Sequence, residues 1–308
     1  MTRRSWLLMG LLSAVWGASY LFIKVALDDG VDPRFVVFSR IVLAALVLVP
    51  IAIRGGALQA LRGRFGPILF MAVVHVSVPF LLITYGEQHI ASSLTGILVS
   101  AAPIFTVLLA LRFDDEERPR GIAAAGVVLG ILGVALLFGV DLSGDATAIA
   151  GGLMVLLASL GYAVGGLYLK ARLGGVPAVG VAASTMVVSA VLLLPAALLA
   201  LPSEMPSGKA IGSLLALGAG GTGLAFLIFY TLIATIGPGR ASLVAYIAPG
   251  FAVFYGVWLL SEPLTAGSIL GLALILSGSW IAAEGRLPGQ ARSAPEVAVE
   301  PPKTREAA

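Results

Sequence analysis

Apolar residues occur in this chain as long runs separated by short polar segments. Ten such runs lie at about residues 6–27, 33–53, 66–86, 91–111, 120–140, 150–170, 177–201, 210–235, 241–260 and 265–283. A run of about 20 apolar residues is long enough to cross the hydrocarbon core of a bilayer as a helix. Barrel strands would instead alternate apolar and polar residues over about ten positions, and no segment does so. The pattern predicts an all-α membrane protein with ten transmembrane helices.

The composition supports the same conclusion. Hydrophobic residues make up 59% of the chain and charged residues only 11%, whereas soluble domains carry about 25% charged residues. Too little polar surface is available for a soluble enzyme, a nucleic-acid-binding protein or a disordered regulator. The chain has no cysteine, which excludes disulfides, thiolate metal sites and cysteine nucleophiles. We expect no cofactor, no metal site, no nucleic-acid partner and no enzymatic activity.

Lysine and arginine are distributed unevenly between the two ends of the predicted helices. With the N-terminus placed inside, the outer segments carry only Lys24, Arg34 and Lys209, while Arg40 lies within a span. The inner segments carry Arg3, Arg4, Arg54, Arg62, Arg64, Arg112, Arg118, Arg120, Lys170, Arg172, Arg240, Arg286, Arg292, Lys303 and Arg305. Basic residues favour the cytoplasmic side of a membrane. Both termini are therefore predicted to be cytoplasmic.

The two ends of the chain have different characters. The first apolar run is about 22 residues long and contains Trp16, Tyr20 and Lys24, where a signal peptide would have a short apolar region and a small-residue cleavage site. We therefore expect a retained first span. Residues 285–308 combine several prolines with scattered charges, which predicts a disordered cytoplasmic tail.

The second half of the chain repeats the first. WGASYLFIKVAL at 16–27 matches YAVGGLYLKARL at 162–173 with a shift of 146, and the same shift places Pro103 on Pro249. Because each half has five spans, an odd number, the second half enters the membrane from the opposite side. The pattern predicts two inverted five-helix repeats, a common architecture of secondary transporters.

Several segments of the two halves resemble those of a known family. They are WGASYLFIK in span 1, PRFVVFSR at 33–40, SAAPIFTVLLA followed by DDEE at 114–117, and YIAPGFAVFYGVWLLSEPLTAGSILGLALILSG in the second half. The chain resembles the drug/metabolite transporter superfamily and, within it, the EamA-type ten-span permeases, over about residues 5–284. The resemblance implies EamA-like repeats at 1–141 and 148–284. It also implies a multi-pass carrier of the bacterial inner membrane, commonly an exporter of amino acids, metabolites or toxic compounds.

Two basic groups lie at membrane depth and are candidates for the transport site. Arg40 lies seven residues past Pro33, about 10 Å into the membrane, and its planar fork suits a carboxylate. The resemblance also implies a basic residue at this place in span 2. Facing a cavity, Arg40 would favour an anionic or zwitterionic substrate; a structural role in packing span 2 is the alternative.

His75 lies near the middle of span 3. Histidine changes charge near neutral pH, so His75 is our candidate for proton coupling; a neutral histidine bonded to a neighbouring helix is the alternative. His89 lies 14 residues further on, about 21 Å along a helix, so the pair cannot share a metal ion within one helix.

Further candidates are aromatic, hydroxyl and proline residues near the middle of their spans. They are Trp16, Ser100, Pro103, Tyr162, Tyr230, Tyr246 and Pro249. Aromatic rings can pack on a substrate and donate one hydrogen bond, and the prolines each remove a backbone hydrogen bond and kink a helix. Packing within the helix bundle is an open alternative for each of them.

Gly126 and Gly130 in span 5, and Gly267 and Gly271 in span 10, form small-xxx-small faces that allow close helix approach. These faces predict either that spans 5 and 10 pack together or that the chain forms a homodimer.

Three functions remain compatible with the architecture. The leading one is a secondary carrier that exports a small organic solute by alternating access. The others are an intramembrane enzyme, for which the spans offer no paired acids or cysteines, and a channel or lipid flippase on the same scaffold.

Overall fold

The computed structural model describes residues 1–113 and 122–284. All regular secondary structure of the described residues is helical, and these residues contain no strand. In chain order the elements are α1 (Arg3–Asp28), α2 (Pro33–Arg54), η1 (Gln59–Leu61), α3 (Phe65–Met71), η2 (Ala72–Ser77), α4 (Val78–Gly86), α5 (Ser92–Val99), α6 (Ala102–Phe113), α7 (Ile122–Val140), α8 (Ala146–Leu173), α9 (Ala178–Leu198), α10 (Gly208–Leu215), η3 (Ala216–Leu224), α11 (Ala225–Ile236), α12 (Pro238–Ala241), α13 (Val244–Leu259) and α14 (Ala266–Glu284).

These elements combine into ten apolar spans. Within the described ranges, nine helical segments are long and apolar enough to cross a membrane, and the sixteen-residue α13 is a shorter tenth. Some spans comprise several elements, as in Phe65–Gly86 and Gly208–Ile236, and α1 is one continuous helix. The prediction of an all-α, ten-helix membrane protein is confirmed.

Polar side chains mark where several helices begin. Asp32 accepts a hydrogen bond from the backbone N–H of Arg34 at the start of α2, where Pro33 takes the first helical position. Asp145 does the same for Thr147 and Ala148 at the start of α8. The first N–H groups of a helix have no partner inside the helix, and an acidic or hydroxyl cap satisfies one of them. The helices therefore start at the polar breaks that separate the apolar runs.

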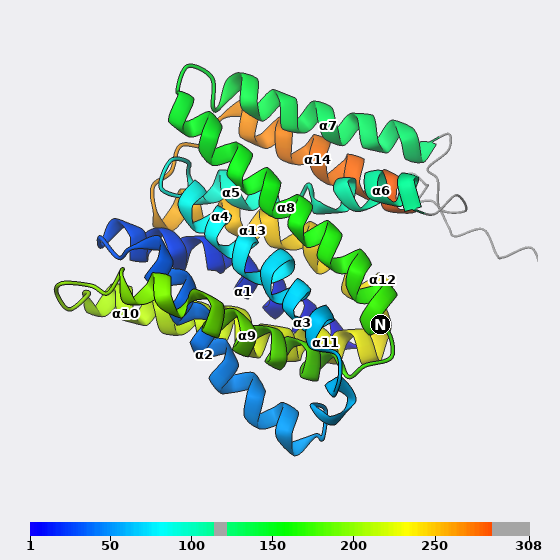
Figure 1. The fold of residues 1–308 in the computed structure, drawn as a ribbon. Helices are drawn as coiled ribbons and strands as arrows, with labels where there is room; N and C mark the ends of the chain where they lie inside the picture. Colours follow the sequence, from blue (N-terminus) through cyan, green and yellow to red (C-terminus); the bar gives the residue numbers. More distant parts are fainter. Residues whose placement is uncertain (114–121, 285–308) are drawn as a thin grey trace, which may run out of the picture.

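Corresponding helices of the two halves make corresponding packing contacts. α7 packs on α14, α2 on α9 and α5 on α13, and each of these pairs joins one half to the other (Figure 1). In the first half α1 packs on α13 and on the α10–η3–α11 span, while in the second half α8 packs on α5–α6 and on the α3–η2–α4 span. This pattern is what two homologous five-helix units produce.

Both halves contain a wide helical turn at the same place. The third span contains a π-helix at Ala72–Ser77, and the eighth contains one at Ala216–Leu224. π-helical turns are rare and occur frequently at functional sites. They place an irregular backbone in the middle of each span, packed against α8 and α9 for η2 and against α1 and α2 for η3.

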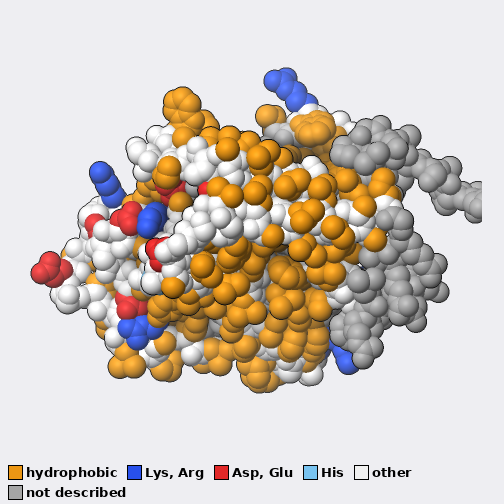
Figure 2. Space-filling view, turned by 90° about the horizontal axis from the view of Figure 1, so that it is seen from above, with side chains coloured by type: hydrophobic (Ala, Val, Ile, Leu, Met, Phe, Trp, Pro, Cys, Tyr) orange, Lys and Arg blue, Asp and Glu red, His pale blue; other side chains and the backbone are white. Residues whose placement is uncertain are grey.

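Hydrophobic and charged side chains separate on the surface. Figure 2 shows hydrophobic side chains covering the middle of the bundle, with most of the visible acidic and basic groups gathered at its left end. Many large apolar side chains are exposed, among them Leu132 at 55% and Val191 at 67%. Apolar exposure of this extent suits contact with lipid rather than water.

The segments that connect the spans lie at two opposite ends of the helix bundle, which we call the Lys24 end and the Arg4 end. Contacts between connections far apart in the sequence show which of them share an end. At the Lys24 end, the N–H of Ser207 donates to Asp29, and Thr265 and Ser268 donate to Asp141. At the Arg4 end, Arg64 donates to the carbonyl of Arg172 over 3.2 Å. Residues predicted to share one side of the membrane therefore meet in the structure.

Glycines allow α7 and α14 to approach closely. A Cβ on Gly126 would lie 2.8 Å from the carbonyl oxygen of Gly278, and one on Gly133 would lie 2.8 Å from the Cβ of Leu274. Distances below about 3 Å leave no space for a methyl group. The prediction that spans 5 and 10 pack together is confirmed.

We predict that Gly126→Val lowers the free energy of unfolding by about 1–3 kcal/mol, because overpacking forces two backbones apart. Gly139→Val is the matched control. Gly139 lies in the same helix, α7, and a Cβ built on it would have no atom within 4 Å other than those of its own helix backbone. The measurement is the thermal unfolding midpoint in detergent. Equal shifts in the two variants would contradict this account of the interface.

Candidate functional site

Arg40 is buried about two turns into α2 and is held on two sides. Only 9% of the residue is exposed. Its Nε donates a hydrogen bond of 2.8 Å to the hydroxyl of Thr222 in η3, and its Cζ lies 3.8 Å above the ring centroid of Phe80 in α4. A cation over an aromatic face is stabilised by the ring quadrupole. Arg40 therefore joins the second span to α4 of the third span and to the π-helix of the eighth.

The π-helix at Ala216–Leu224 makes this contact possible. The hydroxyl of Thr222 donates to the carbonyl of Leu217 over 3.0 Å while accepting from Arg40. At Gly218, a Cβ would lie 3.0 Å from the carbonyl oxygen of Arg40. The small residues of η3 thus let α2 approach closely enough for the guanidinium to reach Thr222.

Arg40 keeps binding capacity that the protein does not use. Among the described residues, only Thr222 accepts a hydrogen bond from it, although a guanidinium carries five N–H donors. Tyr20, Tyr162 and Glu87 lie close enough to interact electrostatically with its charge. The two terminal nitrogens can therefore bind a carboxylate in the forked geometry typical of arginine.

His75 lies in η2, beside Tyr162. The two rings meet edge to face with their centroids 5.5 Å apart, and Gly165 of α8 leaves the space that the imidazole fills. The Nδ1 atom of His75 is buried and has no hydrogen-bond partner among the described residues. The structure therefore brings His75, Tyr162 and Arg40 into one region, but the proton-coupling role of His75 stays a prediction.

Trp16 and Tyr230 belong to a chain of aromatic rings along α11. Trp16 lies 5.2 Å from Phe229 between ring centroids, Phe229 lies 6.3 Å from Tyr230, and Tyr230 stacks on Phe226 at 5.8 Å. Tyr162 and Tyr230 also pack against the cluster whose Phe80 lies under the guanidinium of Arg40, whereas Trp16 and Phe229 pack against the neighbouring cluster.

Ser100 and Tyr246, which are related by the repeat, instead bind α14. The Ser279 hydroxyl donates to the carbonyl of Ser100 over 3.3 Å, and the Tyr246 hydroxyl donates to the carbonyl of Ser279 over 3.4 Å. The Ser100 hydroxyl donates to Ile97 within its own span. These contacts match the packing alternative, and they do not involve Arg40.

The two repeated prolines have different local settings. Pro103 is the second residue of α6, just after the break between α5 and α6, whereas Pro249 lies inside α13 and is buried. At the break, the Ser159 hydroxyl donates to the carbonyl of Leu98 over 3.2 Å. Hydroxyl groups of neighbouring helices thus satisfy backbone groups exposed at this irregular turn.

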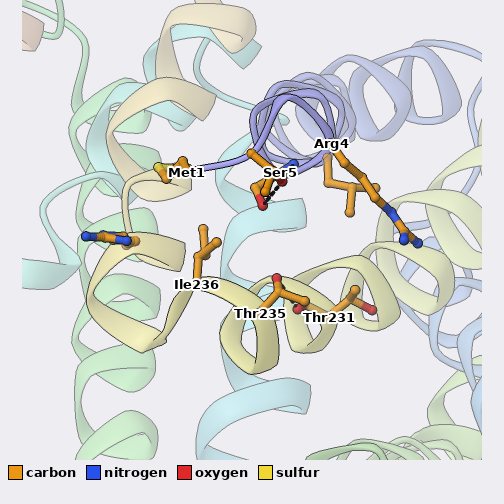
Figure 3. A pocket seen from close by; sticks show the side chains of 9 residues that line it. Met1, Arg4, Ser5, Thr231, Thr235 and Ile236 are labelled. Carbon is orange, nitrogen blue, oxygen red and sulfur yellow. Dashed lines mark hydrogen bonds between the residues drawn. The ribbon is translucent and has the colours of Figure 1, made fainter.

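A cavity of about 670 Å³ opens at the Arg4 end, between the start of α1 and the end of the eighth span. Its lining includes Arg4, Ser5, Thr231, Thr235 and Arg240. Figure 3 shows Thr231 and Thr235 on α11 across the opening from Ser5. This volume lies in the range of small-molecule sites, about 300–1,000 Å³.

The sequence of the chain matches the profile of the EamA-like transporter family twice, at residues 4–139 and 149–283. The chain belongs to this family. It is 27% identical over 277 residues to the uncharacterized transporter YoaV of Bacillus subtilis, covering 88% of this chain and 94% of YoaV. It is 25% identical to the uncharacterized inner membrane transporter YedA of Escherichia coli K12, with 86% of each chain covered.

A third relative carries a more specific name. The probable amino-acid metabolite efflux pump of Salmonella typhimurium is 26% identical over 298 residues, covering 91% of this chain and 95% of the relative. A crystal structure of another protein aligns with a TM-score of 0.65 and 21% identity, covering 92% of this chain and 98% of the other. That likeness supports the fold.

Two acidic residues of this EamA-like transporter were not among the predicted site residues. Glu262, between α13 and α14, accepts hydrogen bonds from the backbone N–H groups of Ser92 (2.7 Å) and Ser93 (2.9 Å) at the start of α5. Glu87, directly after α4, is completely buried. In the sequence both lie at the ends of apolar runs, where acidic residues are normally solvated.

The acidic residues at 114–117 and the tail at 285–308 lie outside the described residues. The predicted disorder of the tail is therefore not tested.

We predict that Thr222→Val destabilises the EamA-like transporter by about 1–3 kcal/mol, because it leaves a buried guanidinium without its acceptor. Thr231→Val is the control, since that exposed hydroxyl bonds only to Leu227 in its own helix. Thermal unfolding of both variants in detergent measures the difference. Equal stability would show that the Arg40 contact contributes nothing to the fold.

Proposed function

We propose that this EamA-like transporter is a secondary carrier of the inner membrane that exports a small anionic or zwitterionic solute by alternating access. Two inverted five-helix units would rock about a central site and expose it to one side at a time. The Arg4 end would face the cytoplasm, in agreement with the excess of basic residues predicted there.

The unequal openness of the two ends carries this proposal. The 670 Å³ cavity lies at the Arg4 end. At the Lys24 end Asp29 accepts from Ser207, and Glu262 accepts from Ser92 and Ser93, whereas at the Arg4 end the described hydrogen bond between the halves is the single one from Arg64 to Arg172. More of the described hydrogen bonds therefore join the halves at the Lys24 end than beside the cavity, which supports a conformation that opens toward the Arg4 end.

The surroundings of Arg40 support the substrate class. A buried guanidinium with unused donors binds a carboxylate well, and the rings of Tyr162 and Tyr230 lie near it in the same apolar region. One relative is named as a probable efflux pump for amino-acid metabolites, a class of solute that includes zwitterions with such a carboxylate. We infer that Arg40 binds the carboxylate and that the aromatic rings pack on the remainder of the solute.

We expect purified protein in liposomes to show saturable uptake of a carboxylated solute and acceleration by the same solute on the opposite side. This acceleration, called trans-stimulation, arises when the binding site returns across the membrane faster with solute bound than when empty. A carrier therefore shows it and a channel does not. A metabolite panel in cells lacking native exporters would choose the solute. Uptake without trans-stimulation would refute alternating access.

We predict that Arg40→Gln reduces transport of carboxylated solutes about tenfold or more, since one lost charged hydrogen bond costs about 1.5–3 kcal/mol. Neutral analogues should be affected less. Arg34→Gln is the control, because Arg34 pairs with Asp32 at the surface. The measurement is uptake in liposomes for paired carboxylated and amidated solutes. Equal losses for both solutes would indicate a structural role for Arg40.

A further inference from the structure

Glu87 is an acidic residue buried at the end of the third span. None of its surface is exposed, and neither carboxyl oxygen has a hydrogen-bond partner among the described residues. An ionised carboxylate in this position would be strongly disfavoured, because burial without compensating donors penalises the charged form. The side chain therefore needs a proton while the structure keeps this arrangement.

The neighbouring lysine does not neutralise Glu87 directly. Lys24 of α1 donates to the backbone carbonyl of Glu87 over 3.3 Å and forms its ion pair with Asp28 at 3.4 Å. On the other side, a Cβ on Gly86 would lie 2.9 Å from the carbonyl oxygen of Gly151 in α8. Helices α1 and α8 thus pack against the backbone at Gly86 and Glu87, and among the described residues no cation forms an ion pair with the Glu87 carboxyl.

Titratable groups of both signs surround Glu87. Tyr20, Lys24 and Asp28 of α1, Arg40 of α2 and Glu262 of the connection before α14 lie close enough to interact with it electrostatically. Burial raises the pKa of the Glu87 carboxyl, and the negative charge of Glu262 raises this pKa further, while Lys24 and Arg40 oppose the rise. Closure of this end thus both buries Glu87 and brings a second carboxylate near it.

The same Glu262 fastens the closed end. Its carboxylate caps α5 through Ser92 and Ser93, five and six residues after Glu87. In a conformation with the Lys24 end open, water would reach Glu87 and hydrate its carboxylate. A group that is buried in one conformation and hydrated in the other binds its proton more tightly in the buried one.

We propose that Glu87 is the proton-binding residue of this carrier, and that its protonation is coupled to closure of the Lys24 end. This rests on the proposed carrier function. On closing, the carboxylate takes a proton from a hydronium ion of the solution on that side, forming a carboxyl O–H bond and releasing water. On opening, the same bond breaks and the proton returns to that solution. Acid on this side favours closure, and alkaline solution favours opening.

A single cysteine can report this opening, because the chain contains no native cysteine. Ser92→Cys places a thiol at a position that is 1% exposed and whose hydroxyl has no described partner. Ser143→Cys, on the exposed connection after α7 at the same end, corrects for the pH dependence of the thiol reaction itself. The probe is a membrane-impermeant maleimide applied to protein in liposomes.

We expect the labelling rate of Ser92→Cys, divided by that of Ser143→Cys, to rise about tenfold or more between roughly pH 5.5 and 8.5, since one linked proton contributes up to a factor of ten per pH unit. Glu87→Gln mimics the protonated acid, so in this background the ratio should stay low at every pH. A ratio that does not change with pH in the parent, or that rises equally with Glu87→Gln, would overturn the proposal.

A second variant keeps the test independent of how well Glu87→Gln folds. Glu262→Gln removes the neighbouring charge but leaves Glu87 in place, so the rise in the labelling ratio should persist with its midpoint at lower pH. An unmoved midpoint would contradict the pairing of the two carboxyls. Elution as a single species and the unfolding midpoint verify folding of each variant.

Transport assays separate this proposal from the carrier function. With Glu87→Gln, counterflow of the selected solute should continue while the pH dependence of net transport is lost. Absence of counterflow in the parent would refute the carrier function and leave the labelling result standing. Counterflow with unchanged pH dependence in Glu87→Gln, and its loss in His75→Ala, would assign the proton to His75 and overturn the role of Glu87.

Discussion

Backbone hydrogen bonding in a medium without water is the constraint on which this structure depends. Every N–H and C=O group at membrane depth needs a partner within the protein, and helices provide it for regular segments. The chain departs from regular helix in its third, fourth and eighth spans, and there side-chain hydroxyls compensate. Ser159 donates to Leu98 at the break in the fourth span, and Thr222 donates to Leu217 in η3. The irregular segments are tolerated because other helices enclose them.

The two halves share an architecture but not their chemistry. Corresponding helices of the two halves pack on each other, as α7 does on α14 along a glycine-lined contact, and each half contains one π-helix. Arg40 is not repeated, because α9, the counterpart of α2, contains no charged residue. In the proposed mechanism, this asymmetric charge within a symmetric scaffold would orient a solute with its carboxylate directed toward α2. This mechanism thus assigns the movement to the duplicated units and the selectivity to Arg40, which has no counterpart in α9.

In the proposed mechanism, closure of one end is linked to burial of an acid. Glu262 accepts from two backbone N–H groups at the start of α5, whereas neither carboxyl oxygen of Glu87 has a hydrogen-bond partner among the described residues. The two acids at this end of the bundle therefore have different surroundings, and burial without donors disfavours the charged form of Glu87.

The sequence alone predicted the all-α class, the number of spans, the repeat and which connections lie at the same end of the bundle, because apolar run length and charge placement respond directly to the bilayer. It also identified Arg40, since a cation inside an apolar run is visible without coordinates. Only the tertiary structure decided that Arg40 binds Thr222, that Ser100 and Tyr246 hold α14, and that Glu87 is buried while Glu262 caps a distant helix. Burial at the end of a span depends on which other segments pack there after folding: Lys24 lies 63 positions from Glu87 in the chain, and Glu262 lies 170 positions from Ser92.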